Sequence, residues 1–279
     1  MLPTGWVVSF RRRTVGARFP EPEQHSVRLL SEGGAKPSLD DANTPVERCA
    51  VPTIGFLHTS PVHGPTFRAR VRHTPGGEGF DQMHRVDESL LADARAIGLD
   101  DDLRGRLRTH LQALGHADVV LCTCSTIGGE AERIASDLGV LFVRIDRPMA
   151  ELAVAGGGRV GIAAALESTI APTRALLLEA AASAGVEVDT LEIDCRAAWP
   201  SFEHGAMTEY LAAVVNAIRA AASREAFRAV VLAQASMADA ATLLAGEPYT
   251  VFSSPQPAVD RAIQLASGDR PPRSVSTAG

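Results

Sequence analysis

The residues with the clearest chemical potential lie in the run Asp118-Val-Val-Leu-Cys-Thr-Cys-Ser-Thr-Ile-Gly-Gly129. Its apolar first half predicts a buried strand that leads into Cys124. Ser125 and Thr126 follow and are expected to cap a helix with their hydroxyls. Because a helix N-terminus stabilises a thiolate, a cysteine at this position is predicted to be reactive.

The residues after this cysteine are expected to shape the ligand site. The glycine pair 128–129 is interpreted as a place where the backbone approaches a ligand, and a helix is predicted over 129–138. Glu130 and Glu132 would then lie in its first turn, where the helix dipole favours acidic side chains. The order of strand, cysteine, cap and helix predicts a binding or catalytic site.

Cys122 lies on the same predicted strand and is assigned to packing, since a core cysteine usually behaves as a small hydrophobe. A metal site built on this C-x-C pair would need further ligands, and the eight histidines form no H-x-x-x-H pattern. The glycine run 156–158 precedes its predicted strand, whereas a dinucleotide-binding loop must follow one. No metal and no cofactor are therefore predicted.

The composition limits the classes of function. A chain of 279 residues with 46% hydrophobic content can bury one large core or two modest ones. No apolar run approaches the roughly 20 residues of a membrane helix. The net charge of −6 leaves no basic face for nucleic acid. We therefore expect a soluble protein that binds neither membranes nor nucleic acid.

The cysteine count and the N-terminal composition suggest a compartment. Four cysteines in a chain of this length do not form a disulfide framework. The apolar stretch before Arg11 is too short for a secretory signal, so we expect reduced thiols and a cytoplasmic location. Residues 1–50 are rich in Pro, Glu, Ser, Gly and Arg without periodicity, and we expect a disordered extension there.

From Pro52 onward, short apolar runs alternate with longer amphipathic stretches, which is typical of α/β proteins with parallel strands. Strands are predicted over 53–58, 82–86, 119–123, 141–145, 159–165, 186–193, 229–233 and 249–252. Helices are predicted over 88–96, 101–114, 129–138, 169–184, 208–222, 237–244 and 257–266. In the helix from 169, Pro172 is expected in the opening turn.

The predicted elements fall into two similar halves, each with strands that end in hydroxyl-bearing residues. Residues 51–155 plus 255–279 are assigned to a first α/β domain and 156–254 to a second, with the glycines 156–158 as a hinge. We expect two pseudo-symmetric, Rossmann-like domains with parallel sheets and a cleft between them. Ligands of open α/β sheets bind beyond the carboxyl ends of the strands, where helix N-termini favour anions. The candidate substrate-binding side chains at these ends are Ser60, Ser125, Thr126, Thr169, Gln234 and Ser236.

These motifs resemble the aspartate/glutamate/hydantoin racemase superfamily over positions 52–267. Cys124-Ser125-Thr126 is similar to its first cysteine motif, Gly161 to Thr169 to its mid-chain strand and carboxylate-binding threonine, and His58 to Pro61 to its first substrate loop. The resemblance implies two pseudo-symmetric domains and cofactor-independent proton transfer next to a carboxylate. In this family two cysteines flank the substrate, one removing the α-proton and the other returning a proton to the opposite face.

The chain departs from the family at the second cysteine motif, which corresponds to Val230 to Met237 and places Gln234 where a thiol is expected. His58 is the first candidate for a replacement acid or base, with His63, His84 and the pair Asp87 and Glu88 as weaker ones. Asp87 is also a candidate helix cap.

Three hypotheses about function follow from the resemblance and this departure. The first is a racemase or isomerase that uses Cys124 on a small carboxylic or amino acid. The second is a single-thiol decarboxylase of arylmalonate type, although such enzymes keep the other cysteine. The third is a carboxylate-binding protein without turnover. A homodimer is left open.

Overall fold

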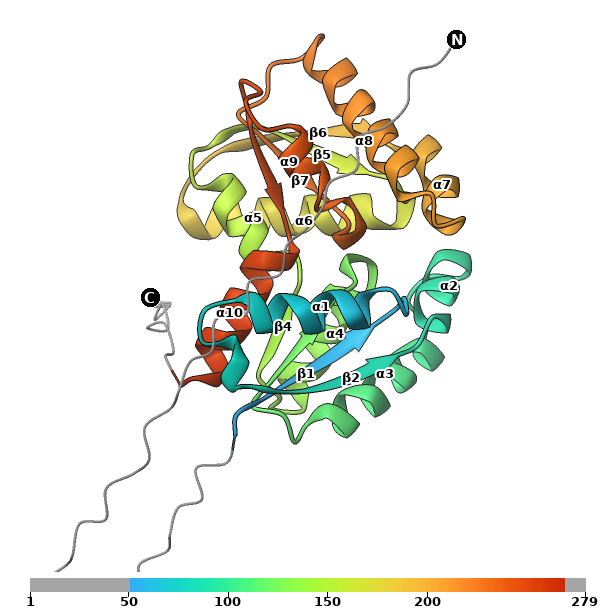
Figure 1. The fold of residues 1–279 in the computed structure, drawn as a ribbon, viewed down its shortest axis with the longest axis vertical. Coiled ribbons are helices and arrows are strands. Elements are labelled where there is room, and N and C mark those ends of the chain that lie inside the picture. Colours follow the sequence, from blue (N-terminus) through green and yellow to red (C-terminus); the bar gives the residue numbers. More distant parts are fainter. Residues whose placement is uncertain (1–50, 269–279) are drawn as a thin grey trace, which may run out of the picture. The chain divides into compact units, whose positions relative to one another are not determined.

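The computed structural model describes residues 51–268. The extension expected over 1–50 lies outside this range, as do residues 269–279. Within it the chain forms two four-stranded sheets, and helices flank each of them (Figure 1). All strand pairings are parallel. The predicted α/β class with two similar halves is confirmed.

The two sheets have the same strand order. The first is β2-β1-β3-β4 and the second is β6-β5-β7-β8. The first sheet contains β1 (Thr53–His58), β2 (Asp81–Val86), β3 (Val119–Cys122) and β4 (Phe142–Arg144). The second contains β5 (Gly158–Ala164), β6 (Val188–Asp194), β7 (Ala229–Leu232) and β8 (Thr250–Ser253). All eight predicted strands are present, with ends displaced by two residues at most.

The helices match the prediction less closely. They are α1 (His63–His73), α2 (Ser89–Ala96), α3 (Asp101–Leu114), α4 (Ser125–Asp137), α5 (Arg147–Val154), α6 (Glu167–Ala184), α7 (Trp199–Glu203), α8 (Met207–Ala222), α9 (Ala240–Leu243) and α10 (Pro255–Ala266). Helices α1, α5 and α7 were not predicted, because Gly64, Pro65, Pro148 and Pro200 obscure their short patterns. Short 3-10 turns cover Gly77–Gly79, Arg196–Ala198 and Ala235–Met237.

The first sheet separates two apolar layers. Phe56 of β1 faces α1 and α10, while its neighbour Leu57 faces α3 and α4. Strand β3 alternates in the same way, with Leu121 on the first side and Cys122 on the second. Successive residues of a strand point to opposite faces, so these continuous apolar runs fit strands that are covered on both sides.

The second sheet is built on the same plan. Ile162 of β5 and Val231 of β7 pack in a layer with α5 and α6. Val230 and Leu232 of β7 pack on the opposite face with α8. Small residues of β5, such as Gly161, leave room there for the side chains of Ile193 and Phe227.

The links between the halves differ from the prediction. Helix α5 precedes the predicted boundary at residue 156, yet its buried Met149 and Ala150 belong to the second core. The glycines 156–158 therefore form a turn inside the second half, where Gly157 and Gly158 adopt φ of +61° and +79°. These left-handed conformations favour glycine at both positions. Helix α10 returns to the first sheet.

No helix within residues 51–268 combines the length and the apolar content needed to span a membrane.

Candidate active site

Cys124 lines a small inner pocket at the carboxyl ends of β3 and β7. The pocket has a volume of about 50 Å³ and is lined by Thr59, Ser60, His63, Leu91, Thr123, Cys124, Ser125, Thr126, Leu166, Thr169, Trp199, Phe202, Gln234, Ala235 and Ser236. It shares several of these residues with an outer cavity of about 740 Å³. The two spaces therefore adjoin, with the thiol at the inner one.

The thiol of Cys124 is distinguished from the other described thiols by its access to this pocket. Cys124 is the N-cap of α4, has extended backbone angles and is 8% exposed. Cys122 and Cys195 are buried in the two cores. Burial raises the pKa of Cys195 to about 12 and that of Cys122 further. Among residues 51–268, Cys124 is the thiol placed to meet a ligand.

Gln234 occupies the corresponding place in the second half. It follows β7 as Cys124 follows β3, and it precedes a helical turn with φ −123° and ψ 143°, against −121° and 118° for Cys124. Its Oε1 accepts a hydrogen bond of 2.9 Å from the backbone N–H of Ala165. An amide therefore lines the pocket where two-fold pseudo-symmetry would repeat the thiol.

The candidate hydroxyls line the pocket but make contacts other than the expected caps. Ser125 Oγ donates to the carbonyl of Ala233 at 2.8 Å and so joins α4 to β7. Thr126 Oγ1 lies 3.3 Å from Ser168 Oγ. Helix α4 consequently has no side-chain cap at its start.

The remaining hydroxyls belong to the first loop and to the second half. Thr169 Oγ1 donates to Leu166 O at 2.6 Å within the first turn of α6. Ser236 Oγ lies 2.8 Å from the buried Tyr210 hydroxyl. Ser60 lines both spaces. Helix α6 begins at Glu167, so Pro172 lies in the helix interior rather than in the opening turn as predicted.

His58 lies behind the pocket rather than in it. Its Nδ1 is 2.9 Å from Thr123 Oγ1, its Nε2 is 2.9 Å from His84 Nδ1, and its side chain is fully buried. Burial and the neighbouring His84 lower the pKa of His58 to about 3. Since neither space includes it, His58 is placed to orient Thr123, not to touch a ligand.

His63 is the histidine that lines the pocket. It begins α1, five residues after the end of β1, and it borders both the inner pocket and the outer cavity. Burial lowers its pKa to about 4, so the imidazole is neutral near pH 7. His63 and Cys124 are the two titratable side chains that line the inner pocket.

The glycines 128–129 of α4 allow close packing inside the protein, and they do not form the predicted approach of the backbone to a ligand. Helix α4 begins at Ser125, so the pair 128–129 lies inside it. A Cβ on Gly129 would lie 3.2 Å from Nη1 of Arg144. Arg144 forms a buried two-point ion pair with Asp146, at 2.7 and 2.9 Å. The two glycines thus allow α4 to pack against the Arg144–Asp146 ion pair.

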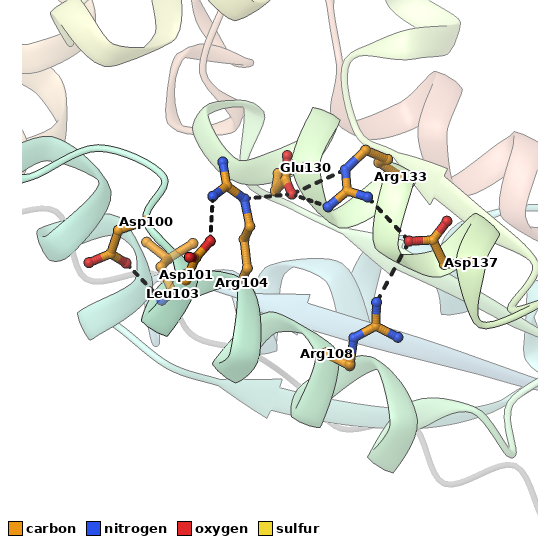
Figure 2. Close-up of polar contacts among 8 residues, drawn as sticks. All are labelled: Asp100, Asp101, Leu103, Arg104, Arg108, Glu130, Arg133 and Asp137. Atoms are coloured by element: carbon orange, nitrogen blue, oxygen red, sulfur yellow. Dashed lines mark hydrogen bonds and ion pairs between the residues drawn. The ribbon is translucent and has the colours of Figure 1, made fainter.

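The far side of α4 is held by an ion-pair network with α3 (Figure 2). Glu130 accepts hydrogen bonds from Arg104 at 3.1 Å and from Arg133 at 2.7 Å. Arg133 also contacts Asp137, which lies 3.6 Å from Arg108. Glu130 and Glu132 were both predicted in the first turn of this helix. They lie beyond it, because α4 begins four residues earlier than predicted.

The outer cavity has aromatic and charged walls. Trp199 and Phe202 lie with ring centroids 4.8 Å apart, and the guanidinium of Arg95 lies 5.8 Å from the Trp199 ring. Glu88 also borders this cavity and is the N-cap residue of α2, so the predicted cap at Asp87 is displaced by one residue. Asp87 accepts a hydrogen bond from Ser89 N–H from the position before the cap. Trp199 was missed because α7 was missed, although its place just after β6 is a usable signal.

Within residues 51–268, no group of three or more His, Cys, Asp or Glu side chains is arranged to hold a metal ion.

Comparisons with known proteins identify the fold. No protein-family model matches the sequence, and no curated protein matches it. Glutamate racemase from Francisella tularensis in complex with D-glutamate is similar in structure, with a TM-score of 0.56 and 14% identity over 78% of this chain and 82% of that one. A mutant of arylmalonate decarboxylase in a sulfate-associated form matches with a TM-score of 0.52 and 20% identity, over 78% and 95%.

Allantoin racemase from Klebsiella pneumoniae gives a TM-score of 0.51 at 15% identity, over 78% of this chain and 89% of that one. These neighbours share the two-half α/β architecture that the strand orders above describe. The chain thus has the same fold as these racemases and arylmalonate decarboxylase, as the family resemblance of its motifs predicts.

Proposed function

We propose that this protein is a cofactor-independent enzyme of the racemase and isomerase type, in which Cys124 transfers a proton at the α-carbon of a carboxylic or amino acid. The observation that carries the proposal is the placement of this thiol in the inner pocket, at the N-terminus of α4. Helix N-termini favour anions, which suits both a thiolate and a substrate carboxylate.

Inversion at carbon needs a second acid or base, because one face loses a proton and the other gains one. His63 is the candidate, since it shares the inner pocket with Cys124. A neutral imidazole can accept a proton at neutral pH, and burial keeps His63 in that form. In this scheme His58 acts only through its hydrogen bond to Thr123.

The outer cavity suits a substrate that carries a bulky substituent. A carboxylate and its α-carbon occupy the inner pocket, and the substituent extends between Phe67, Trp199 and Phe202 in the cavity of about 740 Å³. The aromatic part of these walls favours a substrate with an aromatic or branched group.

A second candidate function is favoured by the amide at Gln234. A decarboxylase that acts on a malonate-type acid breaks one carbon–carbon bond, releases carbon dioxide and protonates the resulting enolate once. A single thiol supplies that proton, so no second acid is needed. An amide opposite the thiol is compatible with this reaction.

The deciding experiment is incubation with chiral amino acids, hydroxy acids and arylmalonates in deuterated water, followed by NMR. Inversion with deuterium at the α-carbon supports the first function, and release of carbon dioxide supports the second. Activity should disappear in Cys124→Ala and persist in the matched control Cys195→Ala. Full activity in Cys124→Ala would refute the role of the thiol, and binding without reaction would indicate a carboxylate-binding protein.

A further inference from the structure

The side-chain amide of Gln234 has a buried donor without an acceptor. Gln234 is 8% exposed and lines the inner pocket. Its Nε2 is shielded from solvent and has no hydrogen-bond partner among residues 51–268. Buried donors are rarely left unpaired, because the cost of removing them from water is then not recovered.

The hydrogen bond to the amide oxygen determines the orientation of the Gln234 amide. Oε1 accepts the hydrogen bond from Ala165 N–H at 2.9 Å. If the amide were flipped, its NH2 group would face the Ala165 N–H, and two donors would meet. Nε2 therefore carries the unpaired hydrogens. Because it is shielded from solvent, a ligand oxygen in the pocket that Gln234 lines reaches it once the neighbouring side chains move apart.

The other residues of the inner pocket indicate the charge of that molecule. The pocket lining contains no Asp and no Glu, and the imidazole of His63 is neutral. It does contain the start of α4, whose free N–H groups attract anions. A ligand oxygen with negative charge is thus favoured, and an ammonium group finds no carboxylate partner there.

We propose that Gln234 forms an anion subsite, in which its Nε2 donates to a carboxylate oxygen of the substrate and to the same oxygen when the α-carbon becomes an enolate. The inference rests on the proposed function. In this proposal the second half of the site binds an oxyanion, at the position where the family resemblance predicts a second thiol. The subsite serves inversion and decarboxylation equally, since both pass through an enolate.

The test uses phenylacetate as the anionic probe and 2-phenylethylamine as a cation of similar size. Gln234→Glu keeps an oxygen for Ala165 N–H and replaces the donor by a second oxygen. At about pH 8 phenylacetate affinity, measured by calorimetry, should fall about ten- to hundredfold, the range for a hydrogen bond to a charged group. The exposed Gln112→Glu carries the same charge change and should bind as the wild type does.

A pH series separates this role from a structural one. At about pH 5.5 the buried carboxyl introduced by Gln234→Glu is protonated and donates again, so the phenylacetate affinity of this variant should recover. Gln234→Leu should bind weakly at both pH values. Equal affinities in wild type and Gln234→Glu at about pH 8 would overturn the subsite, as would tighter binding of the amine than of phenylacetate.

A measurement on the wild type guards against variants that fail to fold. The Gln234 side-chain NH2 resonances should shift on titration with phenylacetate, and unchanged resonances under saturation would overturn the subsite. Loss of binding in the variants with no α-proton exchange by the wild type would support the subsite and refute the enzymatic function. α-Proton exchange that is unaffected by Gln234→Glu would support the enzymatic function and overturn the subsite. Absence of phenylacetate binding by the wild type would also overturn the subsite, whereas the enzymatic function is decided by the exchange assay.

Discussion

The buried ion pair under α4 makes the strongest stability prediction. Asp146 is fully buried and Arg144 is 5% exposed, and their two hydrogen bonds measure 2.7 and 2.9 Å. Replacing Asp146 by Ala leaves the guanidinium buried without a counter-charge. Such a loss costs about 3–5 kcal/mol of the free energy of unfolding. For a domain of this size, about 2–4 °C per kcal/mol gives a decrease in Tm of about 6–20 °C.

The assay is urea and thermal unfolding followed by circular dichroism, with an exposed pair as the control. Arg261 and Glu151 lie 2.8 Å apart with side chains 32% and 41% exposed. Glu151→Ala should cost less than about 1 kcal/mol, because water solvates the remaining charge. Replacing both buried partners, by Arg144→Met and Asp146→Leu together, should recover much of the loss.

Equal destabilisation by Asp146→Ala and Glu151→Ala would contradict a large cost for the unpaired buried charge. A double replacement less stable than Asp146→Ala alone would contradict it as well. Because α4 begins at Ser125 and its glycines contact Arg144, we also expect Asp146→Ala to reduce any Cys124-dependent activity at temperatures where the protein stays folded.

Three further predictions concern the core, the pH dependence and the cavity. Gly161→Ala should destabilise the second half by about 1–3 kcal/mol, since its Cβ would lie 2.7 Å from Ile193 Cδ1; a change below about 0.5 kcal/mol in urea unfolding would contradict this. The free energy of unfolding should fall by about 2 kcal/mol from pH 6.5 to about pH 5 through His58 alone. In this range His58 takes up a proton in the unfolded chain, whereas in the folded protein its pKa of about 3 keeps it neutral. A His58→Gln variant should flatten that slope. Trp199→Ala should weaken binding of aryl-substituted acids more than of short ones in a calorimetric comparison, and an equal effect on both would exclude the outer cavity as the place of the substituent.

Local sequence patterns determined the sheets of this protein. A buried parallel strand is a short apolar run between turn residues, so β1, β3 and β7 are visible in the sequence without their neighbours. The position of Cys124 at the end of such a run is likewise local information. Helices α1 and α5, which are short and have a proline in their first turn, give no comparable signal.

Tertiary structure decided which residues surround the thiol and what they do there. The sequence places Ser125 and the glycines 128–129 next to Cys124, but their partners are Ala233 and Arg144, which lie far along the chain. His58 and His63 are five residues apart, and the sequence favours His58 as the second acid or base. Only the packing shows that the first is buried behind Thr123 and the second lines the pocket, because side-chain exposure depends on contacts between elements that no local pattern records.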